Sequence, residues 1–190
     1  NGAGSFVKAP EIDKDKGVTI LSQINGVATV GLPTMQYNTS VTKYLPNYTV
    51  SSNTTVTLNG NFRDLNIRKG ANVTLNGTIF GKIKVEEGAS VRFTSAVVNI
   101  EELRVDKGSR TTMSYVRFVQ TTSIRVSKNV SIGNDVVVNP DYHSVTFYLG
   151  DTKCDEEKFY VKGDDTKVVA NIYIPNGKLK VLGGNGNDHD

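Results

Sequence analysis

Residues 57–93, "TLNGNFRDLNIRKGANVTLNGTIFGKIKVEEGASVRF", contain nearly the same unit twice and begin it a third time. Each unit has a short alternating run, a turn pair such as Asn-Gly, a second alternating run and a glycine. Apolar residues that alternate with polar ones have the two-residue period of a strand with one buried face. The stretch therefore predicts strands at a regular spacing and no helix between them.

The second run of each unit recurs along the chain. It is found, aligned on its last residue and with spacings of 18, 20, 21 and 21, at residues 64–70, 82–88, 102–108, 123–129 and 144–150. Two positions are always apolar, and these are Leu65, Ile83, Leu103, Ile124 and Val145, followed by Ile67, Val85, Val105, Val126 and Phe147. The closing residue is Gly70, Gly88, Gly108, Asn129 or Gly150. Glycine and asparagine tolerate positive φ best, so this position predicts a left-handed corner.

The first run of each unit lies at 55–60, 72–77 and 90–95. Its Asn-Gly pairs at 59–60 and 76–77 would suit a two-residue hairpin turn. A series of hairpins, however, would not return the same residues to equivalent positions at a regular step. A period of 18–21 residues without helix instead predicts an all-β fold, a parallel β-solenoid (β-helix) in which each repeat is one coil. Ile83 and Leu103 should then lie one above the other in a shared interior.

The pattern divides one continuous domain into three parts. Residues 1–50 are expected to hold N-terminal strands and a capping segment, 51–184 the coils, and 185–190 an acidic tail. Within the first part, residues 17–32 should form the first coil and 32–50 should wrap the mouth of the stack. "IPNGK" (174–178) could be a corner or a hairpin turn, and the corner is favoured. The chain is expected to be a processed piece of a longer protein.

Composition excludes several classes of protein. The net charge of +3 is too small to indicate a nucleic-acid-binding protein, since that needs basic residues clustered on one face. No run of 18 apolar residues is present, so no transmembrane segment is expected. The single cysteine, Cys154, is interpreted as an ordinary thiol, because neither His143 nor His189 completes a recognisable nucleophile signature with it.

The outward positions between the two apolar columns suggest one binding site. Lys84, Arg104 and Arg125 would stack as a basic ladder that could contact a polyanion such as an acidic glycan. The alternative is that the ladder is neutralised by carboxylates two residues further along the same face, Glu86 and Asp106.

Other motifs are weaker. "GGNGND" (183–188) matches the start of a calcium-binding nonapeptide, and "DKDKG" (13–17) matches the start of a calcium loop, but each lacks later ligands. The acidic residues of "CDEEK" (154–158) and the pair at 164–165 have no predicted partner for acid–base work. Threonines at 55, 57 and 74 begin an ice-binding type of rank, which ends at Arg92. No cofactor or metal and no catalytic residue is therefore expected.

The Leu/Ile-x-Val/Ile-x-x-Gly rhythm resembles bacterial polymer-forming solenoids of the bactofilin type. The segment "NIYIPNGKLKVLGG" (171–184) is similar to extracellular bacterial solenoid domains, and the Thr/Asn-rich strands are similar to repetitive surface proteins of gliding or adhesive Bacteroidota. The resemblance implies a secreted or cell-surface protein without catalytic activity.

Two classes of function follow. The first is a structural or adhesive module that acts as a rigid spacer, an adhesin or a filament subunit, with self-association through the open ends of the solenoid. The alternative is a polysaccharide lyase or hydrolase, or a glycan-binding module, on the same scaffold.

Overall fold

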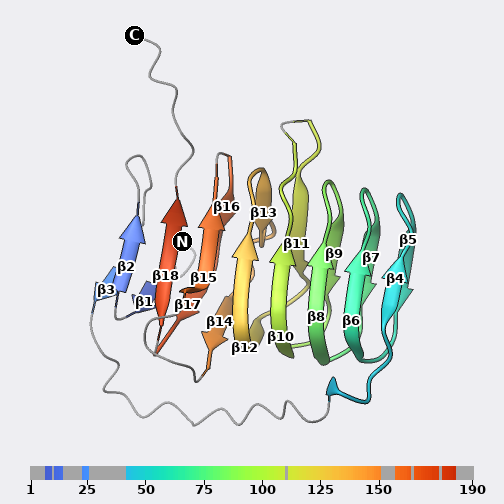
Figure 1. Ribbon diagram of the computed structural model, residues 1–190, viewed down its shortest axis with the longest axis horizontal. Helices are drawn as coiled ribbons and strands as arrows, with labels where there is room; N and C mark the ends of the chain where they lie inside the picture. Colours follow the sequence, from blue (N-terminus) through green and yellow to red (C-terminus); the bar gives the residue numbers. More distant parts are fainter. Residues whose placement is uncertain are drawn as a thin grey trace.

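The computed structural model describes residues 7–9, 11–14, 23–25, 42–109, 111–150, 157–163, 165–175 and 177–182. These residues form a parallel β-solenoid of about five coils, which confirms the predicted fold class (Figure 1). Every strand pairing is parallel, apart from an isolated antiparallel bridge between Ser109 and Thr112.

Each coil has three sides. Side B is a separate six-stranded sheet, whereas sides A1 and A2 are the two halves of a twelve-stranded sheet. The sheet bends between these halves, as in β10, where Glu101 and Glu102 both point outward and the register shifts.

Four long strands run through both A1 and A2: β6 (Phe62–Ile67), β8 (Ile79–Val85), β10 (Val97–Val105) and β12 (Thr122–Ile132). Side A1 also contains β1 (Val7–Ala9), β3 (Gln23–Asn25), β14 (Val145–Leu149) and β17 (Asn171–Tyr173). Side A2 also contains β2 (Glu11–Lys14), β4 (Tyr48–Val50), β15 (Glu157–Lys162) and β18 (Lys178–Leu182). Side B consists of β5 (Thr55–Leu58), β7 (Asn72–Leu75), β9 (Ser90–Phe93), β11 (Ser114–Phe118), β13 (Val136–Val138) and β16 (Lys167–Val168).

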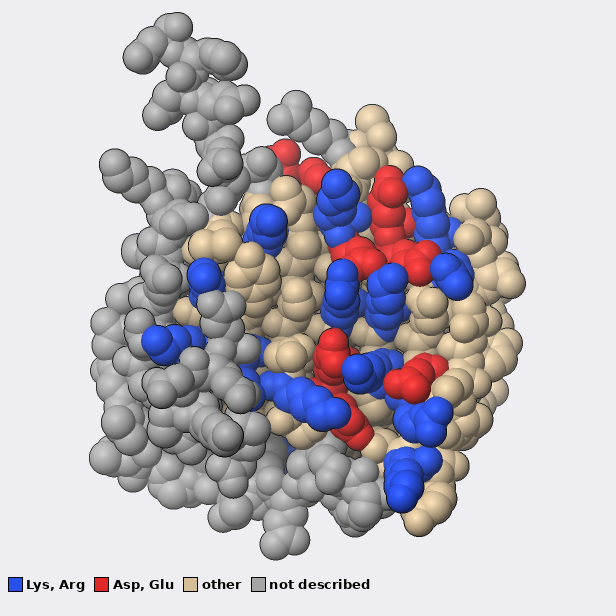
Figure 2. All heavy atoms as spheres, in the orientation of Figure 1, with Lys and Arg blue, Asp and Glu red and all other residues tan. Residues whose placement is uncertain are grey.

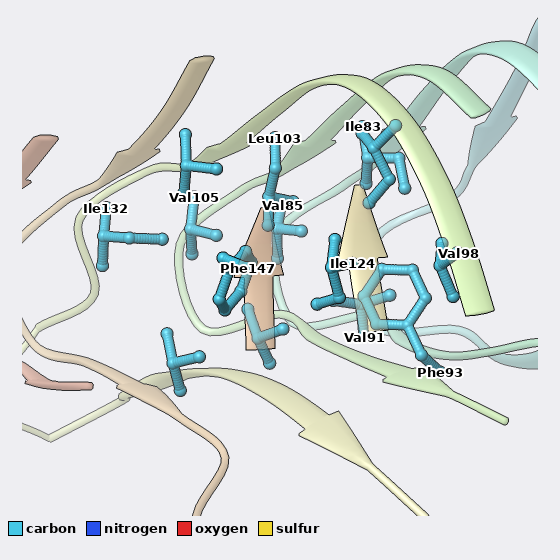
Figure 3. Packing of buried hydrophobic residues seen from close by; sticks show 14 of the residues in the cluster. Ile83, Val85, Val91, Phe93, Val98, Leu103, Val105, Ile124, Ile132 and Phe147 are labelled. Carbon is cyan, nitrogen blue, oxygen red and sulfur yellow. The ribbon is translucent and has the colours of Figure 1, made fainter. Parts of the chain in front are cut away.

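The interior is built from columns of apolar side chains, one from each coil. Leu65 pairs with Ile83, and Ile83 pairs with Leu103, as the spacing predicts. All three are at most 2% exposed, and Figure 3 shows how such side chains fill the space between the sides. One coil cannot close this interior alone, so each apolar residue depends on its equivalents above and below.

The predicted alignment is wrong from the fourth coil onward. Leu103 pairs with Val130, whereas Ile124 pairs with Val98 on side A1. The next member of the column is Phe159, and Val145 pairs with Thr122 on side A1. The step from Leu103 to Val130 is longer than the earlier ones because the connection from β10 to β11 is enlarged. Residues 123–126 therefore lie on side A1, whereas a constant period predicts them on side A2.

The corner prediction is confirmed at two of its five positions. Gly70 and Gly88 adopt φ of 70° and 66°, and the Gly70 amide donates to the carbonyl oxygen of Glu87. Gly108 and Gly150 have no positive φ, and Asn129 lies inside β12, where it pairs with Glu102. The prediction fails at these three positions because the alignment is shifted and the connections of the later coils are longer.

The Asn-Gly pairs of the repeat are corners rather than hairpins. The Asn76 side-chain amide donates to the Asn59 side-chain oxygen at 2.7 Å, so equivalent asparagines bind each other along the stack. At Gly77 an added Cβ would lie 1.9 Å from the carbonyl oxygen of Gly60, so only glycine fits there. The corner predicted at "IPNGK" (174–178) is also confirmed. The strands on either side of it, β17 and β18, pair with β14 and β15 rather than with each other.

The N-terminal strands lie where the sequence did not predict them. β1 pairs with β17 and β2 pairs with β18, so residues 7–14 add a further layer to the C-terminal end of the stack (Figure 1). β3 pairs with β1 at this same end, so residues 23–25 are not part of the first coil. The open strand edges of β17 and β18 accept these strands because a parallel ladder can always be extended by one more strand.

Candidate functional site

Side A2 carries the predicted basic ladder, and only two of its members are neighbours. Lys84 pairs with Arg104, but the next residue in that column is Ser131. Arg125 lies on side A1 between Asn99 and Tyr148, and its Nε is buried without a hydrogen-bond partner within the described part of the chain. The predicted ladder of three is therefore wrong, and only Lys84 and Arg104 are neighbours.

Carboxylates neutralise this pair, as the alternative interpretation predicted. The Lys84 ammonium lies 3.4 Å from Glu86 and 3.3 Å from Asp106, and the Arg104 Nε lies 2.7 Å from Asp106. Arg68 adds a further ion pair to Glu86. Figure 2 shows the result, a surface on which blue and red side chains alternate over β6, β8 and β10. Exposed pairs of this kind contribute little stability and leave little net potential for a polyanion.

Glu101 fastens the segment before β4 to the bend of β10. Its carboxylate accepts a hydrogen bond from the Lys128 ammonium at 2.8 Å and another from the buried Thr42 hydroxyl. Burial alone would raise the pKa of Glu101, but the hydrogen bonds and the positive charge of Lys128 outweigh it, and the pKa is lowered. The carboxylate therefore stays charged and holds residue 42 against the third coil.

The outward face of side B has a different character. Its first coils carry Thr57 and Thr74, and the same column continues through Arg92 and Arg117. The rank of threonines thus ends at the third coil, as predicted. Two arginines on adjacent rungs, about 4.8 Å apart, follow it.

A cluster of aromatic and charged groups surrounds Arg117. Its guanidinium lies over the Tyr115 ring, 4.9 Å from the centroid, and Nη1 binds both carboxylate oxygens of Asp141 at 3.1 and 3.2 Å. The Lys167 ammonium lies 4.7 Å from the centroid of the Tyr142 ring and contacts the Tyr142 hydroxyl. Tyr142 is 65% exposed and is one of the most exposed large hydrophobic residues in the described part of the chain.

The loop that presents Asp141 and Tyr142 is held in place by the buried side chain of Asn139. The Asn139 side chain is fully buried, and its Nδ2 donates to the carbonyl oxygens of His143 and Val169 at 2.7 and 2.8 Å. Its Oδ1 accepts from the His143 amide at 3.1 Å. Asn139 and Tyr142 both have positive φ, 60° and 58°. Asparagine tolerates this conformation, but it is strained for a tyrosine.

Sequence reasoning missed this cluster. Its members come from three coils, on β11, on β16 and in the loop after β13, and the two residues in that loop, Asp141 and Tyr142, belong to no repeat. The only local signals are "NPDYH" (139–143), a turn-rich segment containing an aromatic residue, and the arginines at 92 and 117.

The remaining predicted sites are only partly described. Across the described residues, no group of three His, Cys, Asp or Glu side chains could hold a metal ion. The calcium-like segment 183–190, Cys154 and Asp164 lie outside the described residues, and of the 13–17 segment only the backbone of Asp13 and Lys14 is described. In the same described ranges, no helix is long and apolar enough to cross a membrane.

The two ends of the stack differ. At one end β4 pairs only with β6, and β5 pairs only with β7, among the described strands. At the other end β1 and β2 extend the last coil on sides A1 and A2, so the outermost described strands there are β3, β2 and β16.

Comparison of the chain with protein-family models, with curated proteins and with solved structures found no match in any of the three.

Proposed function

We propose that the chain is a non-catalytic, rigid structural module of a secreted or cell-surface protein, and that it acts as a spacer that displays its outer faces. The observation that carries this proposal is the continuity of the interior columns. Leu65, Ile83, Leu103 and Val130 follow one another without a polar interruption, and the column continues to Phe159 and Leu179. The Leu/Ile-x-Val/Ile-x-x-Gly rhythm of the sequence, which resembles that of bactofilin-type and other bacterial surface solenoids, supports the surface part of the proposal.

Rigidity follows from the hydrogen bonding. In a parallel solenoid each coil is bonded to the coil above and the coil below, so bending the stack would break backbone hydrogen bonds and interior contacts together. The carboxylate–cation pairs on side A2 connect successive coils as well, for example Lys82 with Glu102 at 3.4 Å.

Surface labelling of intact cells that produce the protein tests the location. The protein is expected to react with an impermeant amine reagent and to be cleaved by added protease while a cytoplasmic marker is untouched. Protection of both proteins from both reagents would refute the proposed surface role.

A second function, end-to-end assembly, is favoured by the open edges of β4 and β5. All strands run parallel, so a second copy added head to tail would continue the same ladders, and such a contact repeats into a filament. The backbone defines which groups are available. The Val50 carbonyl accepts from the Arg68 amide, and the Leu58 carbonyl accepts from the Asn76 amide. The backbone groups of Val50 and Leu58 therefore point toward the next coil, whereas the backbone groups of Thr49 and Thr57 point toward the free edge.

Proline at these two positions removes an edge donor without removing an internal hydrogen bond. Thr49→Pro with Thr57→Pro is therefore expected to abolish concentration-dependent assembly in analytical ultracentrifugation and to leave folding intact. Alanine at the same two positions is the matched control, because it keeps both edge amides. Assembly that persists in the proline variant would contradict joining through this end.

A further inference from the structure

We propose that side B carries a binding site for an extended acidic polysaccharide, formed by Arg92, Arg117, Tyr115, Tyr142 and Lys167. This inference rests on the proposed function in one respect: outside a cell, the extended polyanions that a surface module meets are mainly polysaccharides. The geometry of the site does not depend on that role.

Positive charge on side B is only partly balanced by carboxylates. Arg92 and Arg117 are direct neighbours across β9 and β11. Like charges opposite each other in a sheet are destabilising, so this pairing has a cost for the fold. On side A2 the corresponding cost is offset by carboxylates between the cations. On side B, Asp141 binds Arg117, but Arg92 forms no hydrogen bond or ion pair among the described residues. The surface therefore keeps an excess of positive charge that an anionic ligand would neutralise.

The side chains of the site suit an acidic sugar polymer. The planar guanidinium binds carboxylate or sulfate groups through two parallel hydrogen bonds. A tyrosine ring offers an apolar face and a polar hydroxyl, and this combination suits a sugar ring, which also has apolar C–H faces and hydroxyl edges. Tyrosine and arginine, with tryptophan, are enriched among the residues that dominate binding energy at protein–protein interfaces.

The backbone of Tyr142 is held in a strained conformation. A bulky side chain at a φ of 58° is strained, and such residues persist where the surrounding structure holds them in place, often at ligand sites. Here Asn139 holds the loop through three hydrogen bonds. The ring is thus presented to solvent in a fixed position, which lowers the entropy lost when a ligand binds.

The spacing of the groups selects an extended ligand. Arg92, Arg117 and the Tyr142–Lys167 pair follow one another along the stack, because Tyr115 pairs with Val137 and Val137 pairs with Lys167. A linear polymer that lies along the stack would meet these groups in succession. A small monovalent anion would use only one of them and gain little.

Binding is measured on immobilised heparin, which is sulfated, on alginate, which is a uronate polymer, on neutral dextran and on single-stranded DNA. The wild-type protein is expected to bind at least one of the two acidic polysaccharides. Its affinity for dextran and for DNA should be clearly lower. Arg92→Glu should weaken this binding about tenfold. Arg104→Glu, the same charge change on side A2, is the matched control and should weaken it less than about twofold.

Tyr142→Asn separates a binding role from a structural role. Asparagine tolerates positive φ, so the variant should melt at the same temperature as the wild type or higher, while its binding falls about fivefold. A variant that binds as well as the wild type would remove Tyr142 from the site.

Three results would overturn the proposal: no binding of folded wild-type protein to either acidic polysaccharide, equal losses in Arg92→Glu and Arg104→Glu, or tighter binding to DNA. Each leaves the surface role to be decided by the cell-labelling experiment. Conversely, a protein found inside the cell that still binds the acidic polysaccharide through Arg92 would refute the surface role and keep the site.

Discussion

Asn139 and His143 bind each other reciprocally: the Asn139 amide donates to the His143 carbonyl oxygen at 2.7 Å, and the His143 amide donates to Asn139 Oδ1 at 3.1 Å. Together they close the loop that carries Asp141 and Tyr142. Because Asn139 is fully buried, removal of its side chain leaves several backbone groups without partners.

Asn139→Gly keeps a residue that tolerates the φ of 60° but removes these hydrogen bonds. The variant should lose about 2–3 kcal/mol of unfolding free energy, measured by urea denaturation. Asn139→Ala should lose about 1 kcal/mol more, because alanine is also disfavoured at positive φ. If the two variants were equally stable, backbone conformation would contribute nothing at this position.

Neighbouring residues in β7 should differ sharply in their tolerance of charge. Leu75 is fully buried, whereas the Thr74 side chain points outward, so Leu75→Asp places a carboxylate in the interior. This variant should be unfolded or destabilised by more than about 4 kcal/mol, whereas Thr74→Asp should change stability by about 0.5 kcal/mol or less. Circular dichroism and thermal melting of both variants check this, and similar melting temperatures would contradict the assigned register.

The charge of Glu101 should stabilise the fold in a pH-dependent way. The pKa of Glu101 is lowered in the folded protein, so its contribution is complete above the unfolded pKa of about 4.3 and is lost as the pH falls through the folded pKa. Glu101→Gln should therefore cost roughly 1 kcal/mol near neutral pH and less at about pH 3. Denaturant titrations of wild type and variant at both pH values measure the difference, and a difference that does not change with pH would rule out this role.

The N-terminal strands should be separable from the remaining coils. A chain that begins at residue 15 lacks β1 and β2, so the edges of β17 and β18 become available. We expect lower stability at the C-terminal end and new association at high protein concentration. A synthetic peptide of residues 5–16 should bind the truncated chain and suppress association, whereas a scrambled peptide should not. Failure of the peptide to bind would contradict the parallel pairing of β1 with β17.

The parts of the fold that could be predicted are those that repeat. Leu65, Ile83 and Leu103 occupy one column because their spacing is nearly constant and each must match the residue below it. Residues 123–129 repeat the same apolar alternation, so nothing local distinguishes side A1 from side A2, and Arg125 was assigned to the wrong side. Only the length of the connection before β11 would have revealed the shift.

Two further features depend on contacts that a repeat does not encode. β1 pairs with β17, which lies near the other end of the sequence. The alternating pattern of β1 fits the free edge of any strand, so the pattern alone does not identify the partner. The cluster at Arg117 requires a loop from the next coil to fold back over side B, which depends on the buried amide of Asn139 rather than on periodicity.

The position of β1 and β2 has a consequence for the order in which the molecule forms. These strands precede every other described strand in the order of synthesis, yet their partners β17 and β18 are the last of the described strands to be made. The middle coils can stack on one another as they emerge, whereas the opening strands must wait until synthesis has reached residue 182. A chain cut short by premature termination would keep those strands without partners, so completion of the solenoid reports that the message was translated to this point.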